Sequence, residues 1–321
     1  MKWNFKTVSN GEIVELNDDQ KPKVGTYETV LEDACSSKVA NPKFSNFFVK
    51  GNLGTALASV MAGNIEYGLC KALHCEESAV AAWRSRLPLG EPILGIISHV
   101  EGKPASPCGN CRDILRDEFA ELEIVAGTEG GGEAVVVPMK EYLFENYHSA
   151  GSLPRNFKRY LKRIADKGEK SSFDPYSPLN NERKYLAFIA GAKRNYYGSL
   201  SLRCDYHPIY PLEDAIRRAE RNCDAKVGFV MVACEGKMPD VMYRDRQHLL
   251  ELNLDYELLE GKPADPRVYL VNYSSEERDL IINEVKETFV KEWLPMPFSP
   301  RNFGKDFIDN VLKPHVLKKY Q

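Results

Sequence analysis

Two short stretches of this sequence combine residue types that can bind a metal ion and move protons. One is His74-Cys75-Glu76, and the other is Pro107-Cys108-Gly109-Asn110-Cys111. Two cysteines separated by two residues at a helix start can place both sulfurs on one ion, because the exposed amides there favour thiolates. A neutral His74 imidazole as third ligand leaves a Zn²⁺ ion formally neutral, with one tetrahedral position open for water.

Glu76 lies two residues after His74, so on a regular helix the two side chains would diverge by roughly 200°. They can serve one site only at a helix end or where a strand leads into a helix. At such a junction the carboxylate can take a proton from an attacking water and return it to a leaving nitrogen. This set of residues predicts hydrolysis of an amidine-like carbon with loss of ammonia.

Other interpretations of the same residues stay open. A Cys-x-x-Cys before a helix is also typical of a thiol redox pair, which would give His74 and Glu76 no function. A closed structural zinc would form if Cys70 or Cys75 supplied a fourth ligand. Alternatively, Glu76 is a solvated helix residue and His74 a core residue. The remaining cysteines are most simply explained as buried small hydrophobes: Cys35, Cys204, Cys223 and Cys234.

The sequence resembles the cytidine deaminase family in three segments that occur in the family's order. His74-Cys75-Glu76 followed by residues 107–111 matches H-x-E…P-C-x-x-C, the pattern of zinc-dependent nucleoside and base deaminases. Residues 62–68, AGNIEYG, resemble the G-x-N-x-E segment that precedes it. Residues 45–49, SNFFV, resemble the family's S-x-F-x-V-G segment. The resemblance covers residues 45–115 well and the rest of the first half by pattern only.

The resemblance implies a metal site and an activity. Three residues would hold Zn²⁺, namely His74, Cys108 and Cys111, and Glu76 would be the proton shuttle. The implied reaction is hydrolytic deamination of a cytidine-type nucleoside to the uridine analogue and ammonia, with cytidine or deoxycytidine as the default substrate.

The resemblance also implies a nucleoside pocket. Asn64 and Glu66 would hydrogen-bond the ribose hydroxyls, and Phe47 would pack against the pyrimidine. A carboxylate at the sugar 3′-hydroxyl accepts a hydrogen bond but repels a 3′-phosphate, which favours a free nucleoside over a polynucleotide. The simpler interpretations are a surface turn for Asn64 and Glu66 and core packing for Phe47.

The sequence departs from the family pattern around the expected pocket. Cys75 replaces an alanine, Asp113 replaces a glutamine, and Lys50 is inserted before Gly51. Residues 99–104 form an extra polar stretch before the second motif. Because these changes flank the pocket, a modified cytosine nucleoside, such as an antibiotic or its precursor, is an alternative substrate. A non-catalytic, zinc-stabilised binding or scaffold protein is an alternative of another class.

Composition limits the class of protein. With 321 residues the chain is longer than the roughly 250 residues that one core usually reaches, so we expect two domains. The net charge of −3 argues against nucleic acid as the main partner, and the basic stretch at residues 153–168 is most simply a solvated helix face. We find no apolar run of roughly 18 residues and no secretory signal, so we expect a cytosolic protein that does not bind membranes.

The hydrophobic pattern predicts a catalytic α/β domain over residues 27–150, after an irregular leader over residues 1–26. We expect helices over residues 26–39 and 75–83 and from 106 onward, and strands within 47–60 and over 93–100, 123–126 and 134–137. Ser106 is the expected N-cap of the third helix, with Pro107 as its first residue. Residues 151–180, with the basic helix and several Ser-Pro and Asp-Pro turns, are the expected linker.

A second α/β pattern follows over residues 181–321. We expect helices over 211–222, 247–252 and 279–289 and strands over 226–234 and 268–272. Residues 299–308, SPRNFGKDFI, can be aligned with residues 106–115, SPCGNCRDIL, with Arg301 and Gly304 in place of the cysteines. We therefore expect two tandem copies of a three-layer α/β/α cytidine-deaminase-like fold, the second degenerate and metal-free. This organisation resembles the two-domain, dimeric branch of the family, which implies a homodimer.

Overall fold

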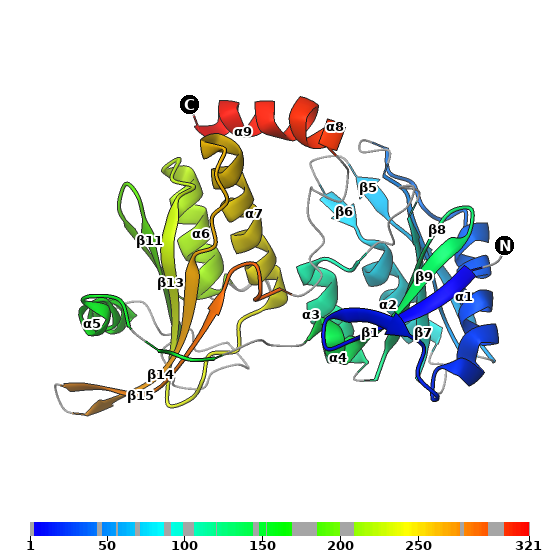
Figure 1. Cartoon of the computed structure of the whole chain (residues 1–321), viewed down its shortest axis with the longest axis horizontal. Coiled ribbons are helices and arrows are strands. Elements are labelled where there is room, and N and C mark those ends of the chain that lie inside the picture. The colour runs from blue at the N-terminus through cyan, green and yellow to red at the C-terminus, as the bar shows by residue number, and fades with distance from the viewer. Residues whose placement is uncertain are drawn as a thin grey trace. The chain divides into compact units, whose positions relative to one another are not determined.

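The computed structural model of the chain divides into two compact units, one built mainly from residues 1–144 and the other from residues 145–294 with 304–321 (Figure 1). It describes residues 3–43, 47–55, 57–67, 71–86, 91–98, 106–119, 121–143, 148–151, 153–168, 185–199, 209–276, 279–294 and 305–320. Among the helices in these ranges, none is both long and apolar enough to cross a lipid bilayer.

The first unit is built on a seven-stranded mixed sheet in the order β2-β1-β9-β8-β7-β3-β4. Its strands are β1 (Trp3–Ser9), β2 (Glu12–Glu15), β3 (Val49–Gly54), β4 (Ser59–Gly63), β7 (Ile93–Ser98), β8 (Glu123–Thr128) and β9 (Gly132–Pro138). A separate hairpin consists of β5 (Ile65–Tyr67) and β6 (Lys71–Leu73). The helices are the short η1 (Lys21–Lys23), α1 (Val24–Ser36), α2 (Cys75–Arg86), α3 (Gly109–Glu118) and α4 (Met139–Tyr142).

Helices cover both faces of this sheet. Successive side chains of a strand point to opposite faces, and in β7 Leu94 and Ile96 belong to the core that includes Trp83 of α2 and Leu115 of α3. Ile97 belongs to the other core, which α1 covers. The unit is therefore a three-layer α/β/α sandwich, and α2 and α3 share one face.

The irregular leader predicted over residues 1–26 is wrong. β1 is an inner strand, parallel to β9 and antiparallel to β2, and Trp3 and Phe5 are buried in the core beneath α1. Alternation of Trp3, Phe5 and Thr7 with polar residues is the period of a half-buried strand. The Asn10-Gly11 signal, read as a break in structure, is the turn of a hairpin, with both residues at positive φ.

The second unit contains a six-stranded sheet in the order β10-β15-β14-β13-β11-β12. Its strands are β10 (His148–Ser149), β11 (Tyr185–Gly191), β12 (Asn195–Ser199), β13 (Val227–Glu235), β14 (Arg267–Glu276) and β15 (Asp279–Phe289). The helices are α5 (Phe157–Gly168), α6 (Pro211–Arg221), α7 (Tyr243–Glu260), α8 (Lys305–Phe307), the π-helical η3 (Ile308–Leu312) and α9 (Lys313–Tyr320).

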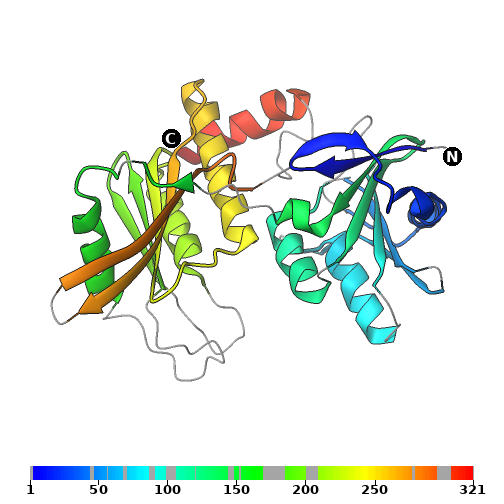
Figure 2. The ribbon, with the colours of Figure 1, turned by 60° about the horizontal axis from the view of Figure 1, so that its bottom comes forward.

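This second unit also has three layers, with α6 and α7 on one face of the sheet and α5 on the other (Figure 2). The linker predicted over residues 151–180 is wrong where α5 lies, because Phe157, Leu161 and Ile164 are buried against the sheet. Four basic residues of the helix are exposed, namely Lys158, Arg159, Lys162 and Arg163. Residues 169–180 of the expected linker lie outside the described residues.

The helix predicted over residues 279–289 is wrong, since this segment is strand β15. It pairs antiparallel with β14 over its whole length, with a register shift at Asn272 and Tyr273. Its charged residues suit a helix surface equally well, so the local pattern was ambiguous. Long-range pairing with β14 decides the outcome, as tertiary context commonly overrides local propensity.

The two sheets have the same plan. β3, β4, β7, β8 and β9 recur as β11, β12, β13, β14 and β15, with the same neighbours and strand directions, including the single parallel pair at the centre. α1, α2 and α3 recur as α5, α6 and α7, each at the same place in the chain order and on the same face. The predicted α/β/α fold in two copies is confirmed.

The sequence alignment offered for the duplication is nevertheless wrong. The counterpart of α3 is α7, because each helix connects the two central parallel strands. Residues 299–308 come after β15, where the repeated plan has no such helix; 299–304 lie outside the described residues and 305–307 form α8. The true counterparts of His74, Cys108 and Cys111 are Tyr210, Met242 and Asp245, at matching positions of α6 and α7.

Candidate metal centre and active site

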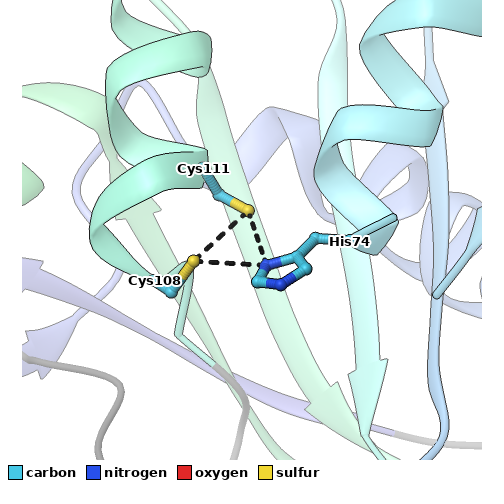
Figure 3. A group of neighbouring side chains, drawn as sticks. All are labelled: His74, Cys108 and Cys111. Atoms are coloured by element: carbon cyan, nitrogen blue, oxygen red, sulfur yellow. Dashed lines mark hydrogen bonds between the residues drawn. The ribbon is translucent and has the colours of Figure 1, made fainter. Parts of the chain in front are cut away.

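The predicted ligands come from the starts of two neighbouring helices. β6 leads directly to His74, and α2 begins at the next residue. Cys108 is the N-cap of α3, in an extended conformation, and Cys111 lies in the first turn. The two sulfurs and the imidazole are turned toward one another (Figure 3). The structure therefore brings His74 to the two cysteines, although more than thirty positions separate them from His74 in the sequence.

The spacing of these three side chains fits a zinc ion. His74 Nδ1 lies 3.3 Å from Cys108 Sγ and 3.4 Å from Cys111 Sγ, and the two sulfurs are 3.6 Å apart. Tetrahedral zinc with bonds of about 2.3 Å to sulfur and about 2.0 Å to nitrogen requires about 3.8 Å between sulfurs and about 3.5 Å between sulfur and nitrogen. Small side-chain movements would meet these values, and two thiolates with one imidazole are a donor set that zinc prefers.

Arg112 holds the backbone that presents Cys108. Its buried guanidinium donates through Nε to the Pro107 carbonyl at 3.0 Å and through an Nη to Ser106 Oγ at 3.2 Å. The guanidinium carbon also lies 4.6 Å from the centre of the Tyr142 ring. Ser106 is thus a partner of Arg112 and not the predicted N-cap, because α3 begins at Gly109.

Without a metal, the ligand set holds protons that an ion must displace. Hydrogen bonds from Cys111 and His74 lower the pKa of the Cys108 thiol to about 4 despite its burial. The hydrogen bond with Cys108 raises the pKa of His74 to about 9. The hydrogen bond with Cys108, followed by burial, raises the pKa of the Cys111 thiol. Metal binding is accordingly coupled to proton release.

Glu76 lies beside the same sulfurs. Its side chain is 7% exposed, and its surroundings include a hydrogen bond with Cys111. Burial, followed by the negative charge of Cys108, raises the pKa of the Glu76 carboxyl to about 7. A carboxyl group with a pKa near neutrality can both accept and release a proton during one reaction cycle. The structure therefore places a carboxyl group with this property next to the predicted metal ligands.

Cys75 is part of the hydrophobic core and not of the ligand group. It is buried among side chains of the sheet and α2, and its sulfur lies close to Gly51, where a Cβ would come within 2.5 Å. Among the described residues, the ligand group at this place contains His74, Cys108 and Cys111. Cys70, the other candidate for a fourth ligand, lies outside the described residues.

Asn64 and Phe47 are brought together at the entrance to β3. The Asn64 amide donates to the Phe47 carbonyl at 2.6 Å, and its oxygen accepts the Val49 N–H at 3.0 Å. The side chain of Asn64 therefore fixes the backbone that carries Phe47, a function that sequence reasoning did not assign to it. Phe47 itself is half-buried.

Glu66 lies in the β5–β6 hairpin, which continues into His74. It is paired with Ala72, two residues before His74, and its side chain is half-buried. Its backbone N–H donates to the Asn41 carbonyl at 3.2 Å. The substrate-binding roles of Phe47, Asn64 and Glu66 stay predictions.

Sequence reasoning missed Glu77 and Asn110. Glu77 Oε2 accepts the backbone N–H of His74 at 2.8 Å, and Glu77 Oε1 accepts from Asn110 Nδ2 at 2.6 Å. The first contact was detectable, because a glutamate three residues after a helix N-cap commonly reaches back to the N-cap amide. The second depends on how α2 and α3 pack, which the sequence does not specify.

Comparison with known proteins gives partial likenesses to solved structures. No family model matches the chain, and no curated protein matches it. The cytidine deaminase from Burkholderia pseudomallei is 24% identical over 36% of this chain and 93% of its own, with a TM-score of 0.32. The enzyme from Mycobacterium leprae is 24% identical over 36% and 96%, with a TM-score of 0.30. That from Mycobacterium tuberculosis is 26% identical over 30% and 82%, with a TM-score of 0.27.

Proposed function

We propose that this protein is a zinc-dependent hydrolytic deaminase of a cytidine-type nucleoside. The observation that carries the proposal is the group formed by His74, Cys108 and Cys111, with the buried carboxyl of Glu76 beside it. A purely structural zinc would need no proton carrier at that place. The spacing of the ligands and the chemistry of their donor atoms support zinc as the ion.

His74, Cys108 and Cys111 would hold the zinc, which when bound supplies a Lewis acid that makes water a stronger nucleophile. Glu76 accepts a proton from the water that attacks C4 of the cytosine ring. One proton of this water goes to N3 of the ring, and Glu76 delivers the other to the departing amino nitrogen. Water is consumed, the C4–N bond breaks, and the products are the uridine analogue and ammonia.

The substrate would be a free nucleoside. We propose that Asn64 acts by holding Phe47 where it can pack against the pyrimidine, since the Asn64 amide binds the backbone of the Phe47 segment. Glu66 would accept a hydrogen bond from a ribose hydroxyl and would repel a phosphate at that position. A homodimer remains part of the proposal because of the resemblance to the dimeric branch of the family.

The deciding experiment is the ultraviolet absorbance of cytidine, deoxycytidine and cytidine monophosphate incubated with zinc-loaded protein. The control is the Glu76→Gln variant, which keeps the size of the side chain and lacks the carboxylate. The proposal expects loss of the cytosine band with the unchanged protein only, while both proteins retain zinc. If neither protein acts on these compounds and both bind zinc, a modified cytosine nucleoside is tested next, and a scaffold function is favoured if that also fails.

A further inference from the structure

One carboxylate connects the starts of the two helices that carry the metal ligands. Glu77, in the first turn of α2, uses one oxygen for the backbone N–H of His74, at 2.8 Å. Its other oxygen accepts from the Asn110 amide, at 2.6 Å. Asn110 lies between Cys108 and Cys111. Glu77 therefore connects the segment that carries the His74 imidazole with the segment that carries the two sulfurs. The separation of these segments sets the distance between the imidazole and the sulfurs.

The second unit has the same connection at the corresponding positions, although it lacks the ligands. Glu213 follows Tyr210, the N-cap of α6, by three residues, as Glu77 follows His74. Arg244 follows Met242, the N-cap of α7, by two residues, as Asn110 follows Cys108. Arg244 and Glu213 form an ion pair at 3.1 Å. Each unit therefore has a side-chain contact that joins the starts of the two helices, and this contact is called the tie below.

The glutamate has a partner of different charge in each unit. In the second unit it is a guanidinium, which also lies 3.6 Å from Asp245, the counterpart of Cys111. In the first unit it is a neutral amide. Two thiolates would leave a bound zinc ion formally neutral, so the first unit offers position 110 no carboxylate like the one that Asp245 offers Arg244. A neutral donor is therefore sufficient at position 110.

From these contacts we infer that Glu77 and Asn110 are positioning residues for the metal centre: their hydrogen bond holds His74 at the correct distance from the two cysteines. The inference rests on the proposed zinc site. Groups outside the ligand set that orient the ligands commonly change metal affinity or activity by about 10-fold to about 100-fold when they are altered. The tie between Glu77 and Asn110 therefore controls the rate at which the protein releases zinc.

The test measures release of zinc from the full-length protein to a chromogenic chelator, with four test variants and one control variant. Glu77→Asp keeps the charge but shortens the side chain, so it cannot reach both partners. Asn110→Asp places a second carboxylate next to that of Glu77, and the two carboxylates repel each other. Both are expected to release zinc about tenfold faster or more. Glu77→Gln keeps the reach, because the Asn110 amide can turn over and accept from the new amide, so its release stays close to that of the unchanged protein.

The double variant Glu77→Gln with Asn110→Asp is the decisive one. The new amide can donate to the new carboxylate while its oxygen still accepts the His74 N–H, so both hydrogen bonds and the net charge return. We expect it to release zinc more slowly than Asn110→Asp alone. If Glu77 served only to cap the start of α2, the double variant would release zinc as fast as Asn110→Asp alone. Far-ultraviolet circular dichroism confirms that each variant is folded.

Glu118→Gln is the matched control. Glu118 pairs with Arg84 and so joins α3 to α2 away from the ligands. The change removes the same charge from the same pair of helices and should leave zinc release unaltered. Slower release from Glu77→Asp than from Glu77→Gln, or no rescue in the double variant, overturns the inference. Zinc release is measured without substrate, so a failure here is distinguishable from a failure to deaminate cytidine.

Discussion

At the scale of single residues, the first turn of α2 serves two environments. Cys75 enters the hydrophobic core and Glu76, the next residue, faces the sulfurs of the metal group. Successive helix residues point about 100° apart, so neighbours in the chain can meet different surroundings. Cys75 therefore takes part in core packing, and Gly51 is the residue that makes room for it.

Adding a methyl group at Gly51 should disturb this packing. The Cβ of Gly51→Ala would lie 2.5 Å from Cys75 Sγ and 3.2 Å from the Gly95 carbonyl oxygen. We expect the free energy of unfolding to fall by about 1–3 kcal/mol, as measured by urea denaturation. Adding Cys75→Ala should recover part of the loss. Gly25→Ala is the control, because a Cβ there meets nothing within 4 Å; equal losses in both single variants would refute this explanation.

A change at Asn64 should separate the pocket from the metal. In Asn64→Asp the side chain can still accept the Val49 N–H, but it faces the Phe47 carbonyl with an oxygen in place of a donor. Because one hydrogen bond is replaced by a repulsive contact, we expect KM for cytidine to rise about tenfold. The zinc content should stay unchanged. Steady-state kinetics and metal analysis test this, and loss of zinc from the variant would show that Asn64 belongs to the metal centre.

Residue types and short spacings were sufficient to predict that His74, Cys108 and Cys111 lie together. Two cysteines three positions apart at a helix start can meet only if they share a turn, and His74 with Glu76 needs a helix end, which β6 and α2 supply. The tie between Glu77 and Asn110 depends on how two helices pack. That packing has no local signature, so the sequence did not reveal it.

At the scale of elements, long-range pairing decided what local patterns could not. The charges of β15 are compatible with a helix surface as well as with a strand, and turn signals interrupt the segment that contains β1. Each forms a strand through pairing with a partner, β14 or β9. By contrast, β7 and β8 were predicted correctly, because buried parallel strands are continuous apolar runs.

The tie between α6 and α7 should contribute to the stability of the second unit. Arg244→Ala leaves Glu213, which is 4% exposed, with Arg217 as its remaining cationic partner. Weakening a buried charged hydrogen bond costs about 2 kcal/mol. We expect this loss in urea unfolding both with and without chelator, because Arg244 lies outside the metal group. Arg218→Ala, which breaks an exposed pair with Asp214, is the control and should cost less than about 1 kcal/mol.

At the scale of the whole molecule, one plan is used twice with different chemistry. The five corresponding strands and three corresponding helices place His74, Cys108 and Cys111 in one unit and Tyr210, Met242 and Asp245 in the other. Where the first unit offers a metal three donors, the second offers an ion pair between its helix starts. We therefore expect the first unit to depend on a metal and the second unit not to.

Removing the metal should accordingly loosen one unit alone. With zinc bound, His74, Cys108 and Cys111 would be joined through one ion; without it, the two helix starts keep only hydrogen bonds among the described residues, namely those of Glu77 and those between His74 and the two sulfurs. We expect about one zinc ion per chain by native mass spectrometry, since three-ligand sites of this kind bind a single ion. After chelation, amide hydrogens of α2 and α3 should exchange at least about tenfold faster, because the local opening energy falls, while those of β13 and β14 stay protected. A content near two ions per chain, or equal acceleration in both units, would mean that the second unit also holds a metal and that the ion pair of Arg244 does not replace it.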